Sequence, residues 1–64
     1  MMLANRVKEF RVAADLQQKE LASGVGVTRQ TVSLIEKGQY NPSLKLCLSI
    51  CHVLEHTLDE IFYV

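Results

Sequence analysis

One short polar segment near the middle of the chain carries side chains whose chemistry suits the edges of DNA bases. Arg29 and Gln30 can each form two hydrogen bonds at once, arginine with guanine and glutamine with adenine. Ser33 follows one helical turn later, and Lys37 adds a cation that phosphates attract. The segment therefore predicts base contacts from Arg29, Gln30 and Ser33, and phosphate contacts from Thr31 and Lys37.

A helix predicted over about 28–37 would present these side chains together. Val32 and Ile35 fix its buried direction, because successive residues of a helix turn by about 100°. The side that begins with Gln30 then points outward. Thr28 suits the N-cap of this helix. It is also counted among the residues expected to bind DNA.

Apolar residues recur at helical spacing along the chain, so the fold class is predicted to be all-α. The expected helices cover about 4–14, 18–25, 28–37 and 43–54, with a short fifth helix that begins after Thr57. Gly26 ends the second helix, since glycine readily adopts the left-handed conformation common at that position. Two short helices around a tight turn can place the second of them, N-terminus first, in the major groove of DNA.

The length of 64 residues allows a single domain, predicted over 1–64 as a compact five-helix bundle. Its hydrophobic fraction of 48% argues against disorder and leaves apolar surface for a partner, for which a homodimer is the simplest arrangement. No apolar run is long enough to span a membrane, and no leader pattern is found. The expected location is therefore the cytoplasm.

Charge is distributed unevenly although the net charge is zero. Residues 1–39 carry six Lys or Arg against four Asp or Glu, which gives +2, and residues 40–64 carry one against three, which gives −2. The half that contains the predicted reading helix is therefore the basic one, as a nucleic-acid partner requires.

Six short pieces in order resemble the Cro/C1-type (XRE-like, phage repressor-like) helix-turn-helix family. The pieces are Arg6-Val7-Lys8-Glu9-Phe10-Arg11, Gln18-Lys19-Glu20-Leu21-Ala22, Gly26-Val27-Thr28-Arg29-Gln30-Thr31-Val32-Ser33, Ile35-Glu36-Lys37-Gly38, Asn41-Pro42-Ser43 and Leu58-Asp59-Glu60-Ile61-Phe62. The resemblance implies a five-helix bundle of the lambda repressor-like type that binds operator DNA, commonly as a dimer. Two departures, Gln17 at an N-cap and Gly24 inside a helix, are each expected to cost about 1 kcal/mol.

The resemblance also assigns roles outside the reading helix. It implies that Gln18, at the positive end of the second helix, contacts a phosphate. It implies a salt bridge between Arg11 and Glu36, which fits the partly buried faces on which both residues fall. Tyr40 and Asn41, in the loop after the reading helix, are expected to contact phosphates, although Tyr40 suits a packing role equally well.

The helix over 43–54 carries two apolar stripes where a surface helix needs one. The first consists of Leu44, Cys47, Leu48 and Cys51, and the second of Leu46, Ile50 and Val53. The second stripe and the apolar C-terminus are expected to form a dimer interface, made of Leu46, Ile50, Val53, Phe62, Tyr63 and Val64. Phe62–Val64 and Met1–Leu3 are further expected to pair as a short β-ribbon.

Cys47, Cys51, His52 and His56 have a spacing that invites a metal or redox sensor. On one helix the cysteines and histidines face opposite ways, so one tetrahedral site within a subunit is not expected. Free, buried thiols are the favoured interpretation, and a redox switch or a site shared across a dimer is kept as an alternative. No cofactor is expected.

These patterns predict a sequence-specific DNA-binding transcriptional regulator, a repressor that acts as a homodimer on a palindromic operator. An antitoxin, or another module that binds a protein partner through the same fold, is the alternative. An enzyme is not expected, because the chain carries no nucleophile–base pair, paired carboxylates or phosphate-binding glycine loop.

Overall fold

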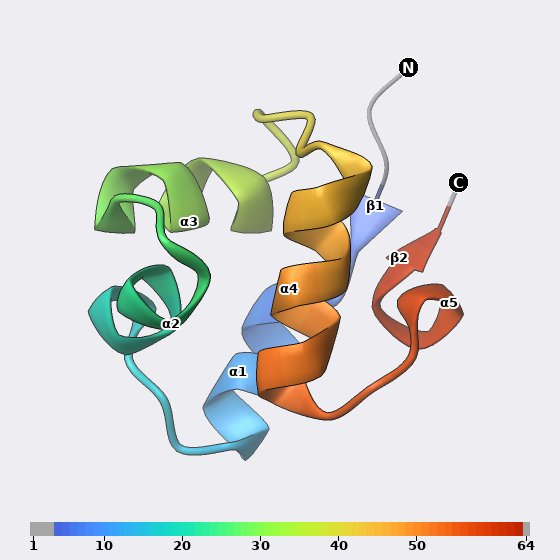
Figure 1. Cartoon of the computed structure of the whole chain (residues 1–64), viewed down its shortest axis with the longest axis horizontal. Coiled ribbons are helices and arrows are strands. Elements are labelled where there is room, and N and C mark those ends of the chain that lie inside the picture. The colour runs from blue at the N-terminus through green and yellow to red at the C-terminus, as the bar shows by residue number, and fades with distance from the viewer. Residues whose placement is uncertain (1–3, 64) are drawn as a thin grey trace.

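The computed structural model describes residues 4–63, which form five helices and a small two-stranded sheet (Figure 1). The elements in chain order are β1 (Ala4–Asn5), α1 (Val7–Ala13), α2 (Gln18–Val25), α3 (Arg29–Glu36), α4 (Leu44–Leu54), α5 (Leu58–Ile61) and β2 (Phe62–Tyr63). The all-α bundle with a helix-turn-helix and a terminal β-ribbon is thus confirmed. No helix within residues 4–63 is long and apolar enough to cross a membrane.

The β-ribbon differs from the prediction in the residues that form it. Ala4 pairs with Tyr63 and Asn5 with Phe62 in antiparallel register, while Met1–Leu3 and Val64 lie outside the described residues. Helix α1 consequently begins at Val7 and not near residue 4. The Asn5 side chain accepts a hydrogen bond from the Val7 amide (3.0 Å), so the strand residue itself supports the start of the helix.

The Asn5 side chain also joins the ribbon to the end of α3. Its amide Nδ2 donates to the carbonyl oxygen of Ile35 at 2.8 Å. One side chain therefore links the end of α3 to the ribbon, between residues that are 30 positions apart in sequence.

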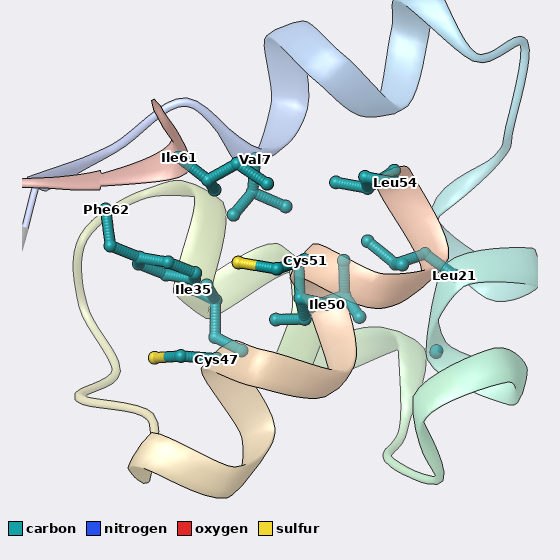
Figure 2. Close-up of a cluster of buried hydrophobic side chains, with 11 residues drawn as sticks. Val7, Leu21, Ile35, Cys47, Ile50, Cys51, Leu54, Ile61 and Phe62 are labelled. Carbon is teal, nitrogen blue, oxygen red and sulfur yellow. The ribbon is translucent and has the colours of Figure 1, made fainter. Parts of the chain in front are cut away.

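Helix α4 lies in the middle of the molecule, with α2 and α3 on one side and α5 with the ribbon on the other (Figure 1). Its inward residues Cys47, Ile50, Cys51 and Leu54 meet buried side chains from the other helices, among them Val7, Leu21, Ile35 and Ile61 (Figure 2). Burial of this cluster is the main stabilisation available to so small a chain.

Helix ends follow local signals in the sequence. Thr28 and Ser43 accept hydrogen bonds from the Thr31 and Leu46 amides, at 3.1 and 3.2 Å, as expected for N-caps. At the start of α2 the Glu20 carboxylate accepts from the Gln17 amide (2.8 Å). This hydrogen bond offsets part of the cost expected from Gln17, because it satisfies one amide at the helix start.

Gly24 has no evident purpose within the subunit. It lies in α2 without a positive φ, and a Cβ at this position would lie 3.6 Å from Cγ2 of Val53, an ordinary van der Waals distance. Alanine would therefore fit, although glycine costs a helix about 1 kcal/mol relative to alanine.

Candidate nucleic-acid interface

The outward face of α3 carries the side chains predicted to contact DNA. Val32 and Ile35 are buried, as the helical spacing predicted, and this burial sets the orientation of the helix. Arg29 and Gln30 are exposed in its first turn, and Ser33 is half-buried one turn later. A cationic and an amide side chain are thus displayed together at the amino end of the helix.

The turn between α2 and α3 places this amino end beside α2. Gly26 adopts the left-handed conformation (φ 76°) and ends α2, and the Val27 amide returns to the carbonyl of Ala22 at 3.0 Å. The hydroxyls of Thr28 and Thr31 lie 2.9 Å apart. These two threonines therefore shape the start of α3 in addition to lying on its exposed side.

Glu36 connects three helices at the other end of α3. Its Oε2 accepts from Nε of Arg11 at 2.6 Å, and its Oε1 accepts from Nη2 of the same arginine at 3.3 Å. Its Oε1 also accepts from Nε2 of Gln18 at 2.9 Å, and Arg11 donates further to the Leu16 carbonyl at 2.7 Å. The ion pair that the resemblance implied is present, and Gln18, which was expected at a phosphate, adds a third side chain to it.

A polar hollow of about 380 Å³ lies between the start of α2 and the start of α3. It is lined by Arg11, Gln17, Gln18, Lys19 and Arg29. Since the Arg11 guanidinium is engaged with Glu36, Lys19 and Arg29 supply the available positive charge, beside the backbone amides of the α2 N-terminus. Such a hollow suits a phosphate group.

Lys19 is absent from the set of residues expected at this surface. The signal that could have identified it is its place in the first turn of α2, directly after Gln18. There an exposed cation adds to the positive helix end and attracts an anion.

The loop after α3 lies at the carboxyl end of the same surface. Lys37 and Asn41 are exposed, and Gly38 turns the chain with a φ of 72°. Tyr40 is partly exposed and lines a hollow with Val25 of α2, Val27 of the α2–α3 turn and residues at the start of α4. Its ring therefore has packing neighbours as well as an exposed part.

Two residues of the expected dimer interface belong to the core of the subunit. Ile50 is 0% exposed and Phe62 is 6% exposed, so the interpretation of Ile50 and Phe62 as interface residues is wrong. Both are covered by helices of the same chain (Figure 2). Leu46 and Val53 are half-buried against this core, Tyr63 is exposed, and Val64 lies outside the described residues.

The cysteines and histidines of α4 and its end face different surroundings. Cys47 and Cys51 are free and buried, and burial raises the pKa of both thiols. His52 is exposed, while the His56 ring stacks on Phe10 with centroids 3.9 Å apart. Among residues 4–63, no three His, Cys, Asp or Glu side chains gather as a metal ion requires.

Comparisons with known proteins agree with this geometry. A family model described as helix-turn-helix matches residues 7–61. An HTH-type transcriptional regulator of Archaeoglobus fulgidus is 47% identical over 60 residues, which cover 94% of this chain and 84% of the relative. The cryptic phage CTXphi transcriptional repressor RstR of Vibrio cholerae is 39% identical over 44 residues, which cover 69% of this chain and 40% of RstR.

A solved structure shows the same arrangement of helices. The restriction-modification controller protein C.AhdI from Aeromonas hydrophila superposes with a TM-score of 0.79 at 35% identity, over 84% of this chain and 82% of that protein. The turn at Gly26 and the Arg11–Glu36 pair lie within the range of the family model, which also covers the matched pieces except for Arg6 and Phe62. The chain therefore belongs to the helix-turn-helix family of the Cro/C1 type, whose members are transcriptional regulators with a DNA-binding fold.

Proposed function

We propose that this protein represses transcription by binding a specific DNA sequence through α3, inserted N-terminus first into the major groove. The observation that carries the proposal is the surface at the start of α3. Arg29 and Gln30 are exposed there beside the amides and Lys19 of the α2 N-terminus. Side chains that read bases thus lie next to a site suited to the phosphate backbone.

The residues of this surface divide by chemistry. Arg29, Gln30 and Ser33 contact base edges, because their side chains can donate to or accept from the groove atoms that distinguish base pairs. Phosphates are contacted by the remaining set, which consists of Gln18, Lys19, Thr28, Thr31, Lys37, Tyr40 and Asn41. Burial of Val32 and Ile35 and the anchoring of Glu36 keep the reading side chains in register.

Two copies acting on a palindrome extend the small surface of one chain. A homodimer with half-sites about one helical turn apart, roughly 34 Å, would place α3 of each copy in successive major grooves on one side of the duplex. Repression would follow from blocking access of polymerase to the bound site in the cytoplasm of a prokaryotic cell. No cofactor takes part in this mechanism.

Selection from a random pool of DNA duplexes tests the proposal. The purified protein should enrich a palindrome, and its affinity should fall steeply with added salt, because cations on the protein displace counterions from DNA. Weak, salt-sensitive binding without any enriched sequence would contradict it. A pull-down for protein partners would then test the antitoxin alternative.

A further inference from the structure

Helix α4 displays an apolar strip that no part of the described chain covers. Leu44 is 65% exposed, and Leu48, one turn further, is 50% exposed. With Gly24, Val53 and polar neighbours they line an open groove of about 530 Å³ between α2 and α4. The surplus stripe expected from the sequence therefore exists, but it consists of Leu44 and Leu48 and not of Ile50.

Gly24 lines the groove without contributing a side chain. The subunit tolerates a Cβ at this position, as the 3.6 Å separation from Val53 shows. Because Gly24 has no side chain, another molecule can approach α2 closely at this point of the groove. The groove shares no lining residue with the hollow between the starts of α2 and α3 that suits a phosphate.

Charges along the same surface are opposite at its two ends. Lys45 lines the groove near the start of α4. Beyond Leu48, a second hollow is lined by Glu55 and Glu60 together with His52 and His56. Leu58 and Asp59 of α5 follow and are exposed. A surface with a cation at one end, acids at the other and leucines between them is complementary to itself when turned by 180°.

We infer that this groove is covered by a second copy of the chain, with the two α4 helices antiparallel across a twofold axis at the level of residue 50, midway between the exposed Leu48 and His52. Lys45 of each copy then meets the acidic end of α4 and α5 in the other. Lys45 and Glu55 are separated by about 15 Å along the helix, so the two charge pairs flank a central contact in which Leu48 of each copy lies opposite His52 of the other. The inference rests on the dimeric state in the proposed function and supplies its interface.

Sedimentation equilibrium over a range of micromolar concentrations tests the interface without DNA. Leu48→Asp should raise the dimer dissociation constant at least tenfold while the helical circular dichroism remains that of the wild type. Val12→Asp is the matched control, because Val12 is 58% exposed on α1 and lies outside the groove. It should leave the dimer unchanged.

Exchanging the charges of two residues tests the interface with a result that a folding defect could not produce. Lys45→Glu alone should weaken the dimer, and the double variant with Lys45→Glu and Glu55→Lys should restore it, because each new charge again meets its opposite. A Leu48→Asp variant as dimeric as the wild type would overturn the interface, as would the absence of rescue.

The inference and the proposed function fail in distinguishable ways. A wild-type protein that stays monomeric yet selects a DNA sequence would overturn the interface and leave DNA recognition intact. A dimer that dissociates with Leu48→Asp but selects no DNA would support the interface and overturn the proposed function.

Discussion

The Glu36 carboxylate links three helices through hydrogen bonds. It accepts hydrogen bonds from Arg11 of α1 and Gln18 of α2 while belonging to α3. Both charged side chains are largely shielded from solvent, with exposures of 10% for Arg11 and 4% for Glu36. The net stabilisation from a shielded ion pair is smaller than the free energy lost when one of its members is removed. The remaining charge is then buried without a partner.

Replacing Glu36 with Ala should therefore destabilise the protein by about 3–5 kcal/mol, since the Arg11 guanidinium would remain buried and unpaired. Urea unfolding followed by circular dichroism measures this loss. The double variant with Arg11→Met and Glu36→Leu, which removes both charges, should recover most of it. A loss below about 1 kcal/mol for Glu36→Ala would show that water reaches the pair freely.

At the proposed DNA surface, Gln30→Ala and Arg29→Ala should each relax base preference at one position of a half-site, by about 1–3 kcal/mol. Lys37→Ala should instead weaken binding to all sequences and lower the salt slope by about one per site. Lys8→Ala, exposed on α1, is the control for loss of one positive charge. Binding to a set of single-base operator variants separates the two behaviours, and unchanged preference in both α3 variants would refute the assignment.

At the scale of elements, one carboxylate caps the start of the short helix α5. Glu60 accepts from the Thr57 amide at 2.7 Å and lies 3.3 Å from Nδ1 of His56. The Thr57 amide, first of all, holds the pKa of Glu60 below its usual range, and the Thr57 hydroxyl and His56 add to the effect. The ionised form is therefore favoured in the folded chain.

The sign of the resulting pH dependence follows from this lowered pKa. Stabilisation by Glu60 is fully present above the ordinary glutamate pKa and is lost as the pH falls through the lower value of the folded state. The stability difference between the wild type and Glu60→Gln should shrink on acidification, as thermal unfolding at several pH values would measure. Glu9→Gln serves as the control, and a difference that grows at acidic pH would contradict the assignment.

Local signals explain which elements could be predicted from the sequence. Helices α2 and α3 begin and end close to the expected residues, because Thr28, Gly26 and the apolar spacing act within a few positions. The start of α1 was misplaced, since the strand that precedes it exists only by pairing with Phe62–Tyr63 at the far end of the chain. No local pattern contains that partner.

The same reasoning applies to the surfaces of α4 and α2. Helical spacing identified two apolar stripes on α4, but which of them faces the core depends on where α1, α2 and α5 pack around it. Ile50 was therefore assigned to the wrong side. Similarly, the hydrogen bond between Gln18 and Glu36 joins residues 18 positions apart, a contact that only the packing of α2 against α3 creates.

At the scale of the whole molecule, the two thiols report on opening of the core. Cys47 and Cys51 lie among buried side chains (Figure 2), and burial raises the pKa of both, which lowers the thiolate fraction. The thiolate is the reactive form of cysteine. Modification therefore requires both exposure and ionisation, which the folded chain opposes.

A thiol-specific reagent should accordingly label the native protein at least about 100-fold more slowly than the chain in concentrated denaturant, because labelling requires opening of the core. The rate of colour development at pH 8 measures both thiols. The Cys51→Ala variant reports on Cys47 alone. Rapid labelling of one thiol per native chain would show that Cys51 is reached through the adjacent hollow.

The pairing of Ala4 with Tyr63 has a consequence for how the polypeptide could be rearranged. The two strands run antiparallel, so the first and last described residues lie side by side, across α4 from α2 (Figure 1). A short peptide linker between them would join the two ends of the backbone. New termini could then be introduced in the exposed segment around Asp15 and Gln17, which gives a circular permutant. The fold is thus suited to insertion into a loop of another protein as well as to attachment at its end.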